Sequence, residues 1–307
     1  MGALNTPERM LESMRDWLDV RNENYWTYNL LMQRLHDAQQ EIVRQISNES
    51  PSFFWTEYDV NLVAGQSLYA LPRNARLGTR WLAAENHVSG TPYYYLFDVD
   101  MRRHLYAGGS WPWTNQSSSH VTLQGPHLRV VPPPGANVPG GLRLGYVCQH
   151  GNMIQRPGTG TVTATAFSLA GGESDCVRRY GRLDPRDGYY DGMTAYVVSG
   201  TGAGQERIIS QWHGASRTAT IAAAWTSTPT ASSVFSFQCP VPEDFTDVVC
   251  LRGAMLAAAK GTRQSRTLDP VYFGAPGRPG RWHEMMAWVG KRQDFTSPTV
   301  EPFGSAF

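Results

Sequence analysis

The sequence has few charged residues and no clear excess of either sign. Charged residues make up 17% of its 307 residues, and 27 basic against 26 acidic side chains give a net charge of +1. A domain dedicated to DNA binding normally carries a basic excess, and its affinity falls steeply with salt. This charge balance therefore gives no indication that the protein binds DNA tightly or recognises its sequence. A hydrophobic share of 41% is enough to form a core and argues against a disordered chain.

Cysteines are few, and they lie far apart. Cys148, Cys176, Cys239 and Cys250 form no Cys-x-x-Cys pair, which argues against zinc knuckles and against a disulfide-dense secreted fold. We interpret them as small buried hydrophobic residues of a reducing compartment. No apolar run approaches the length that spans a bilayer, and the first residues lack a basic start followed by an apolar run. Neither a membrane partner nor a signal peptide is therefore expected.

Apolar residues recur at helical spacing near both ends of the sequence. The first run follows Thr6, which can cap a helix, and Pro7 suits the first helical position. A second stripe runs from Tyr28 to Ile46. Helix is expected again after Pro242, and once more around Trp282.

Between these helices the apolar period changes to two, which predicts strands. The run from Trp55 to Val60 and the run from Leu68 to Leu71 flank a turn at Gly65, which predicts a hairpin. Residues 158–237 have a different texture, rich in Thr, Ala, Ser and Gly, with short alternating stretches. Such short strands between glycine-rich turns predict a small sandwich or barrel.

The predicted fold class is therefore α+β: a discontinuous helical bundle with a β-sheet extension and a second, inserted small all-β domain. The predicted domains are an N-terminal helical hairpin at 1–50, a β domain at 51–157, the inserted β domain at 158–237, C-terminal helices completing the bundle at 238–292, and an extended tail at 293–307.

Two motifs suggest chemistry, and both have a structural interpretation. The segment Ser199 to Gln205 is rich in glycine but lacks the Gly-Lys-Ser/Thr ending of a phosphate loop, and a strand-like run follows it. We predict a glycine turn between strands. Asp184, Asp187 and Asp191 could serve glycoside hydrolysis, but Asp, Pro and Gly also build turns, and we favour the turn. The eight histidines show no metal spacing. No enzyme, catalytic residue, cofactor or metal site is expected.

Aromatic residues are the best candidates for an interface. They make up 11% of the chain. Four tryptophans could stack on sugars: Trp111, Trp113, Trp212 and Trp225. We favour the core for Trp225 and leave the role of Trp111 and Trp113 open. The predicted interface residues are Phe295, Phe303, Phe307, Trp282, Met286, Trp111 and Trp113.

Several segments together resemble the head-to-tail adaptor (connector) proteins of tailed bacteriophages. The order is an N-terminal helical hairpin with Leu31 to Ile42, then Gly65 to Pro72, Leu128 to Pro134 with Leu142 to Tyr146, and Val241 to Phe245 opening a helix. The segment from Tyr190 to Trp225 looks like a β module that recurs in phage structural proteins. The resemblance covers residues 1–262.

The resemblance implies a structural protein of the virion neck, made in the host cytoplasm. It implies a ring of about twelve subunits that joins the portal protein to a tail or nozzle protein. It also implies that the ring lines the channel through which DNA passes without sequence-specific binding. The alternative is a tail-associated protein that binds or depolymerises carbohydrate, which the β content and the tryptophans would suit.

Overall fold

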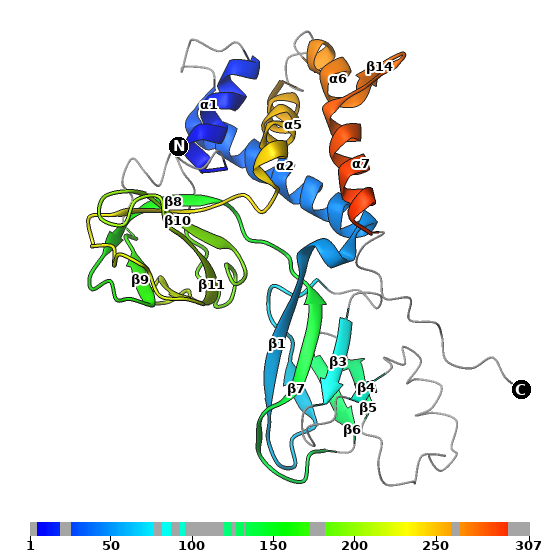
Figure 1. Ribbon diagram of the computed structural model, residues 1–307, viewed down its shortest axis with the longest axis vertical. Helices are drawn as coiled ribbons and strands as arrows, with labels where there is room; N and C mark the ends of the chain where they lie inside the picture. The colour runs from blue at the N-terminus through cyan, green and yellow to red at the C-terminus, as the bar shows by residue number, and fades with distance from the viewer. Residues whose placement is uncertain are drawn as a thin grey trace, which may run out of the picture. The chain divides into compact units, whose positions relative to one another are not determined.

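The computed structural model describes residues 5–18, 26–76, 82–86, 93–95, 120–124, 127–131, 133–171, 182–258 and 265–293 (Figure 1). The chain divides into two compact units. Unit 1 contains Met1–Phe53 and His150–Phe307, and unit 2 contains Phe54–Gln149. Each unit has a core of its own, and each is described by itself below.

Unit 1 contains five α-helices among the described residues. They are α1 (Pro7–Leu18), α2 (Tyr28–Glu49), α5 (Thr246–Ala258), α6 (Ser265–Phe273) and α7 (Arg281–Gln293). The predicted start at Pro7 is confirmed. The Oγ1 atom of Thr27 caps α2 by accepting a 3.4 Å hydrogen bond from the backbone N–H of Leu30. Short 3-10 turns, Pro51–Phe54 and Glu243–Phe245, follow α2 and precede α5.

The central helix is α5, which is buried on nearly all sides. Its sequence has no polar stripe, a pattern typical of a helix enclosed by others. It contacts α1, α2, α6 and α7. Gly253 faces both N-terminal helices, because a Cβ atom there would lie 3.2 Å from the sulfur of Met14 and 3.5 Å from the Cα of Leu35. The missing side chain therefore lets α1 and α2 both approach α5 closely.

The segment between α5 and α7 contains a helix that the sequence did not predict. α6 includes Pro270, a residue that normally ends or kinks a helix, and its apolar pattern is short. The following Pro/Gly stretch forms a tight hairpin, β14 (Gly274–Ala275) with β15 (Arg278–Pro279). Gly274 has a φ of +95°, a conformation that side-chain-bearing residues rarely adopt.

Six strands of unit 1 close into an antiparallel barrel. In chain order they are β8 (Ile154–Thr159), β9 (Ala166–Leu169), β10 (Thr194–Ser199), β11 (Glu206–His213), β12 (Thr218–Ile221) and β13 (Val234–Phe237). Their order around the barrel is β10-β11-β12-β9-β8-β13. Closure leaves no unpaired strand edge in this module.

Aromatic rings fill the interior of the barrel. Phe167 and Phe235 stack with their ring centroids 4.2 Å apart, and Phe237 lies edge-on to Tyr190 and Trp212. All five side chains are fully buried. The barrel is thus a packed core, because these rings occupy the space that a ligand would need.

Unit 2 contains two antiparallel sheets in its described part. The first has the order β1-β7-β3-β4, formed by β1 (Trp55–Leu62), β7 (Val138–Val147), β3 (Leu82–Asn86) and β4 (Tyr93–Tyr95). The second has the order β2-β6-β5, formed by β2 (Leu68–Ala70), β6 (His127–Val131) and β5 (His120–Gln124). One buried cluster that includes Leu128, Leu144 and Tyr146 contains residues of both sheets.

The predicted hairpin between Trp55 and Leu71 is wrong. β1 pairs with β7, and β2 pairs with β6, so the two runs belong to different sheets. Alternation identified both runs as strands, but it carries no information about the partner of a strand.

The predicted fold class is also wrong: the protein is not a discontinuous helical bundle with a β-sheet extension. About 33% of the described residues are helical and about 31% lie in strands, and the strands include a closed six-stranded barrel with its own core. A bundle would bury most of its apolar surface between helices. Periodicity located most of these elements, but it could not reveal that the strands close on themselves.

Candidate functional site

The predicted interface residues Trp282 and Met286 lie on α7, and both side chains are half-buried. The Trp282 ring stacks on the ring of Tyr272 in α6 at a centroid distance of 5.8 Å. Met285 and Val289 are buried on this helix. Trp282 and Met286 therefore lie beside the buried stripe of α7, where part of each remains accessible to a partner.

Arg281 fixes the beginning of α7 against the start of α5. Its guanidinium donates two hydrogen bonds to the Asp247 carboxylate, at 2.7 and 3.1 Å, and a third to Glu284 at 2.6 Å. The hydrogen bonds that Arg281 donates to Asp247 are the main reason that the pKa of Arg281 is raised. The two hydrogen bonds between Arg281 and Asp247 fix the orientation of the start of α7 against α5. An interface built on α7 would consequently be positioned before any partner binds.

The other predicted interface residues lie outside the described residues. They are Trp111, Trp113, Phe295, Phe303 and Phe307.

Two of the four tryptophans considered for sugar stacking, Trp212 and Trp225, are core residues. Trp212 is fully buried, and Trp225 is 5% exposed. Trp225 packs beside Phe167 and Phe235, and the Arg207 guanidinium lies 5.6 Å from its ring centroid. Carbohydrate stacking requires an exposed ring face, and neither of these rings offers one.

The three aspartates of the 184–191 loop accept hydrogen bonds from backbone N–H groups. Asp184 accepts from Arg186 at 2.9 Å, Asp187 from Gly214 at 2.8 Å, and Asp191 from Trp212 at 2.6 Å. Burial raises the pKa of Asp191 to about 6. The hydrogen bond from the Arg186 side chain lowers the pKa of Asp184. Asp187 and Asp191 thus hold the loop to β11 and the residue that follows it, while Asp184 fixes the loop internally.

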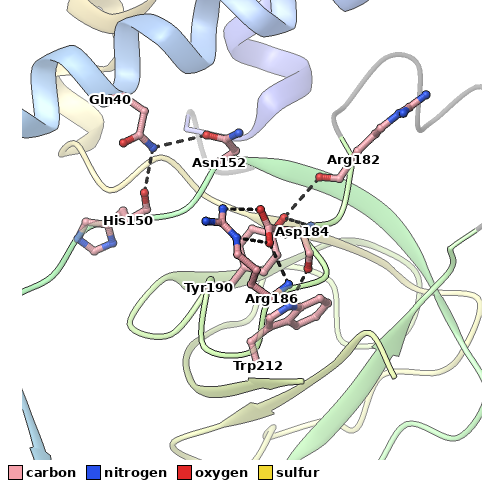
Figure 2. A network of polar contacts seen from close by, with 8 residues as sticks. All are labelled: Gln40, His150, Asn152, Arg182, Asp184, Arg186, Tyr190 and Trp212. Carbon is pink, nitrogen blue, oxygen red and sulfur yellow. Dashed lines mark hydrogen bonds and ion pairs between the residues drawn. The ribbon is translucent and has the colours of Figure 1, made fainter. Parts of the chain in front are cut away.

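The same loop is tied to buried aromatic side chains, as Figure 2 shows. The indole N–H of Trp212 donates to the backbone oxygen of Asp184 at 3.1 Å, and the Tyr190 hydroxyl accepts from the Asp184 N–H at 2.9 Å. Arg186 adds two side-chain hydrogen bonds to Asp184, at 2.6 and 2.8 Å. The loop is thus fixed from both its backbone and its side chains.

The glycine-rich segment 199–205 is a turn between strands, as predicted. It joins β10 to β11, which pair antiparallel, so no helix N-terminus is available to hold a phosphate. Gln205 holds the turn, since its side-chain oxygen accepts from the N–H groups of Thr226 and Ser227 and its side-chain nitrogen donates to two carbonyls. The segment has a structural role.

A row of polar side chains on α2 was missed by the sequence reasoning. His36 bonds to the carbonyl oxygen of Met153 at 2.9 Å, Gln39 donates to that of Gly151 at 2.8 Å, and Gln40 donates to that of His150 at 2.9 Å. Figure 2 shows Gln40 reaching both His150 and Asn152. We call these contacts the α2 clamp. The available signal was Gln39, a polar residue on the apolar stripe of the helix.

Two histidines at the α2 clamp are kept neutral by burial. Desolvation lowers the pKa of His36 to about 4, against smaller opposing effects of the Met153 carbonyl and Asp37. Burial also lowers the pKa of His150 to about 4. A neutral ring matches the surroundings of the clamp, because a buried charge without full compensation is costly.

No metal site and no membrane span is found in the described part of the chain. No group of three or more histidine, cysteine, aspartate or glutamate side chains in these ranges could hold a metal ion. In the same ranges, no helix is both long and apolar enough to cross a membrane.

Comparison with known proteins identifies one family. A search of curated proteins found no match. Residues 8–150 match the family model of the SU10 adaptor protein. The matched range contains α1 except its first residue, all of α2 and all of unit 2. The resemblance to phage head-to-tail adaptors is therefore confirmed: over residues 8–150 of its 307, this chain is similar to the SU10 adaptor protein family.

Proposed function

We propose that this chain is a structural adaptor of a tailed phage, located at the junction of head and tail. The match of residues 8–150 to the SU10 adaptor family carries the proposal. The packed barrel interior and the structural contacts of the 184–191 and 199–205 loops agree with a protein that works by assembling rather than by catalysis.

In the virion neck, the adaptor forms a ring of about twelve subunits between the portal and the tail or nozzle protein. A closed ring repeats one head-to-tail contact, so each subunit needs two different surfaces that complement each other. Trp282 and Met286 on α7 are candidates for one of them, because both side chains are partly accessible and the helix is anchored by Arg281.

DNA passes through the ring without being read. The chain has a net charge of +1, so it offers no broad basic field that would hold the phosphate backbone and slow the passage. A chain without a basic excess suits a protein through which DNA passes without being held.

The family match ends where the barrel begins. Residue 150 is the first residue of unit 1 after unit 2, and β8 starts at Ile154. The barrel and the helices α5 to α7 lie beyond the matched range. We propose that the barrel is an added module, inserted between the α2–unit 2 part and the C-terminal helices.

The mass and shape of the purified protein test this function. Analytical ultracentrifugation should give a mass of about twelve chains, and negative-stain electron microscopy should show rings with a central hole. A catalytically inactive monomer that binds immobilised glycans would instead support the carbohydrate-binding alternative. Monomers that bind neither glycans nor portal protein would contradict both functions.

A further inference from the structure

Two loops of unit 2 meet at a place where the sequence has no charge. No charged residue occurs from Val60 to Pro72 or from Val130 to Leu142. The charged residues next to these ranges include Asp59 and Arg143, which pair with each other at 2.9 Å. Arg143 also lies 3.6 Å from Glu57. We call residues 63–66 and 133–139 the loop tip. They follow β1 and precede or begin β7.

Hydrogen bonds hold the two loops of the tip together. The Gly65 N–H donates to the carbonyl oxygen of Pro134, and the Ala64 N–H donates to the Asn137 side chain, both at 2.8 Å. The Gly140 N–H donates to the Asn61 side chain, also at 2.8 Å. These contacts join residues that are 69 to 79 positions apart in the sequence. The tip is therefore built as one body rather than as two independent loops.

Tyr69 reinforces the tip from the core side. Its ring is 5% exposed, and its hydroxyl accepts from the Val63 N–H at 3.0 Å and donates toward the Gln66 carbonyl at 3.0 Å. A surface loop that is ordered in advance loses little conformational entropy when it binds.

Most exposed side chains of the tip are small and apolar, and Gln66 and Asn137 are its exposed polar residues. Val63 is 43% exposed, and Ala64, Pro133, Ala136 and Pro139 are exposed as well. Leu68, which follows the tip on β2, is 45% exposed. Surface loops usually carry polar and charged residues. A rigid, uncharged and largely apolar loop surface is typical of a binding site.

We propose that the loop tip inserts into an uncharged, apolar groove on a different protein of the virion. The groove must lack charge, because the tip offers no ion to compensate a charge that it would desolvate. The groove should also present few unpaired hydrogen-bonding groups. The backbone N–H groups of Val63, Ala64 and Gly140 are already satisfied, because they donate to Tyr69, Asn137 and Asn61.

The small size of the tip argues against a second copy of this chain as the protein that binds it. The tip contains four residues in one loop and seven in the other, while a stable protein interface takes roughly 20–30 residues on each side. A contact that holds two subunits together in a ring needs more than this surface. A small contact becomes strong when several copies bind one assembly at the same time. This step rests on the proposed ring.

The substitution Ala136→Asp tests the proposal by placing a charge on the tip. Ala203→Asp is the matched control, because Ala203 is an exposed alanine in the glycine turn of the barrel. Each full-length variant is supplied to cells infected with a phage that lacks a working copy of this chain. The amount of the chain in purified particles is measured together with the infectious yield. The mass of each purified variant is measured by ultracentrifugation.

The proposal predicts that Ala136→Asp keeps the wild-type mass but enters particles at least ten times less well, while Ala203→Asp behaves as wild type. Equal incorporation of Ala136→Asp would overturn it. A smaller assembly of Ala136→Asp alone would also overturn it, because the tip would then contact a second copy. Should Ala136→Asp fail to fold, Ala64→Asp on the other loop is judged by the same outcomes. Absence of the wild-type chain from particles would contradict the proposed function rather than the role of the tip.

Discussion

Ile154 and Phe237 are direct partners in the barrel: the first residue of β8 lies opposite the last residue of β13 in antiparallel register. The chain thus enters and leaves the barrel at neighbouring points. This is the geometry in which a module can be inserted into a host without separating the host's ends. The barrel also has a core of its own, filled by aromatic rings.

We predict that the barrel folds by itself. A fragment of residues 152–239 should be soluble and unfold in one cooperative transition, because its strands pair in a closed ring and need no partner strand. Circular dichroism and two-dimensional NMR of the fragment check this. Replacement of residues 154–237 by a short Gly/Ser linker should leave the remaining chain folded. A fragment with poor signal dispersion would show that the barrel depends on the helices.

Phe167→Ala should destabilise the barrel strongly. The side chain is fully buried and stacks on Phe235, so its removal leaves a cavity among rings that cannot collapse, at a cost of about 3–5 kcal/mol. Urea unfolding of the isolated barrel measures the loss. Ile208→Ala is the control, since Ile208 is 56% exposed on β11 and should change the free energy of unfolding by less than about 0.5 kcal/mol. Equal losses in the two variants would contradict the described packing.

The α2 clamp should weaken as the pH falls from 6.5 toward 4. His36 has a folded-state pKa of about 4, below its usual value of 6.5, so the unfolded chain binds the proton first. Its contribution is complete above pH 6.5 and is lost as the pH falls through this window. Protonation linked to His36 alone should lower the free energy of unfolding by about 2 kcal/mol between pH 7 and pH 5.

His36→Gln provides the test of this pH dependence, because glutamine can still donate to the Met153 carbonyl but does not titrate. The variant should lose less stability than the wild type between pH 7 and pH 5, as measured by urea unfolding at both values. His283→Gln, at an exposed position of α7, should retain the wild-type pH dependence. An unchanged pH dependence in His36→Gln would show that protonation of His36 does not oppose folding.

Asp191→Asn should stabilise the protein at pH 8. Burial raises the pKa of Asp191 to about 6, above its usual value, so at pH 8 the carboxylate is ionised in the folded state and its desolvation opposes folding. The amide oxygen of asparagine can still accept the hydrogen bond from the Trp212 N–H. The melting temperature of the variant should exceed that of the wild type at pH 8, and this gain should disappear near pH 4. A lower melting temperature at pH 8 would contradict this explanation.

The last residues should bind another subunit or the portal, as their aromatic content indicates. Phe295, Phe303 and Phe307 can each bury a ring, and Pro298 and Pro302 favour an extended backbone. Truncation after Arg292 should therefore reduce ring formation or co-purification with the portal. A truncated chain that forms rings and retains portal at the wild-type yield would show that these residues are not an interaction element.

Local features of this fold could be predicted, and long-range ones could not. Pro7 marks the start of α1 because its restricted φ suits that position. The glycine turn before Glu206 was recognisable because a strand-like run follows it. The pairing of Ile154 with Phe237, however, joins residues that are far apart in the sequence, and no local pattern encodes it.

The missed features have similar physical causes. Pro270 concealed α6, since proline normally interrupts a helix. The hairpin prediction failed because the partners of β1 and β2 are distant strands. The contacts of Gln39 and Gln40 depend on where residues 150–151 lie in three dimensions. The proposed loop tip likewise joins two uncharged segments that become one surface only in the folded protein.

Cryo-electron microscopy of the virion neck would show whether this chain is the adaptor. We expect a ring of about twelve copies of this chain between portal and tail, with the six-stranded barrel as its recognisable module and the channel at its centre. A neck whose density between portal and tail is fully explained by other proteins, or a chain found only on the tail fibres, would contradict it.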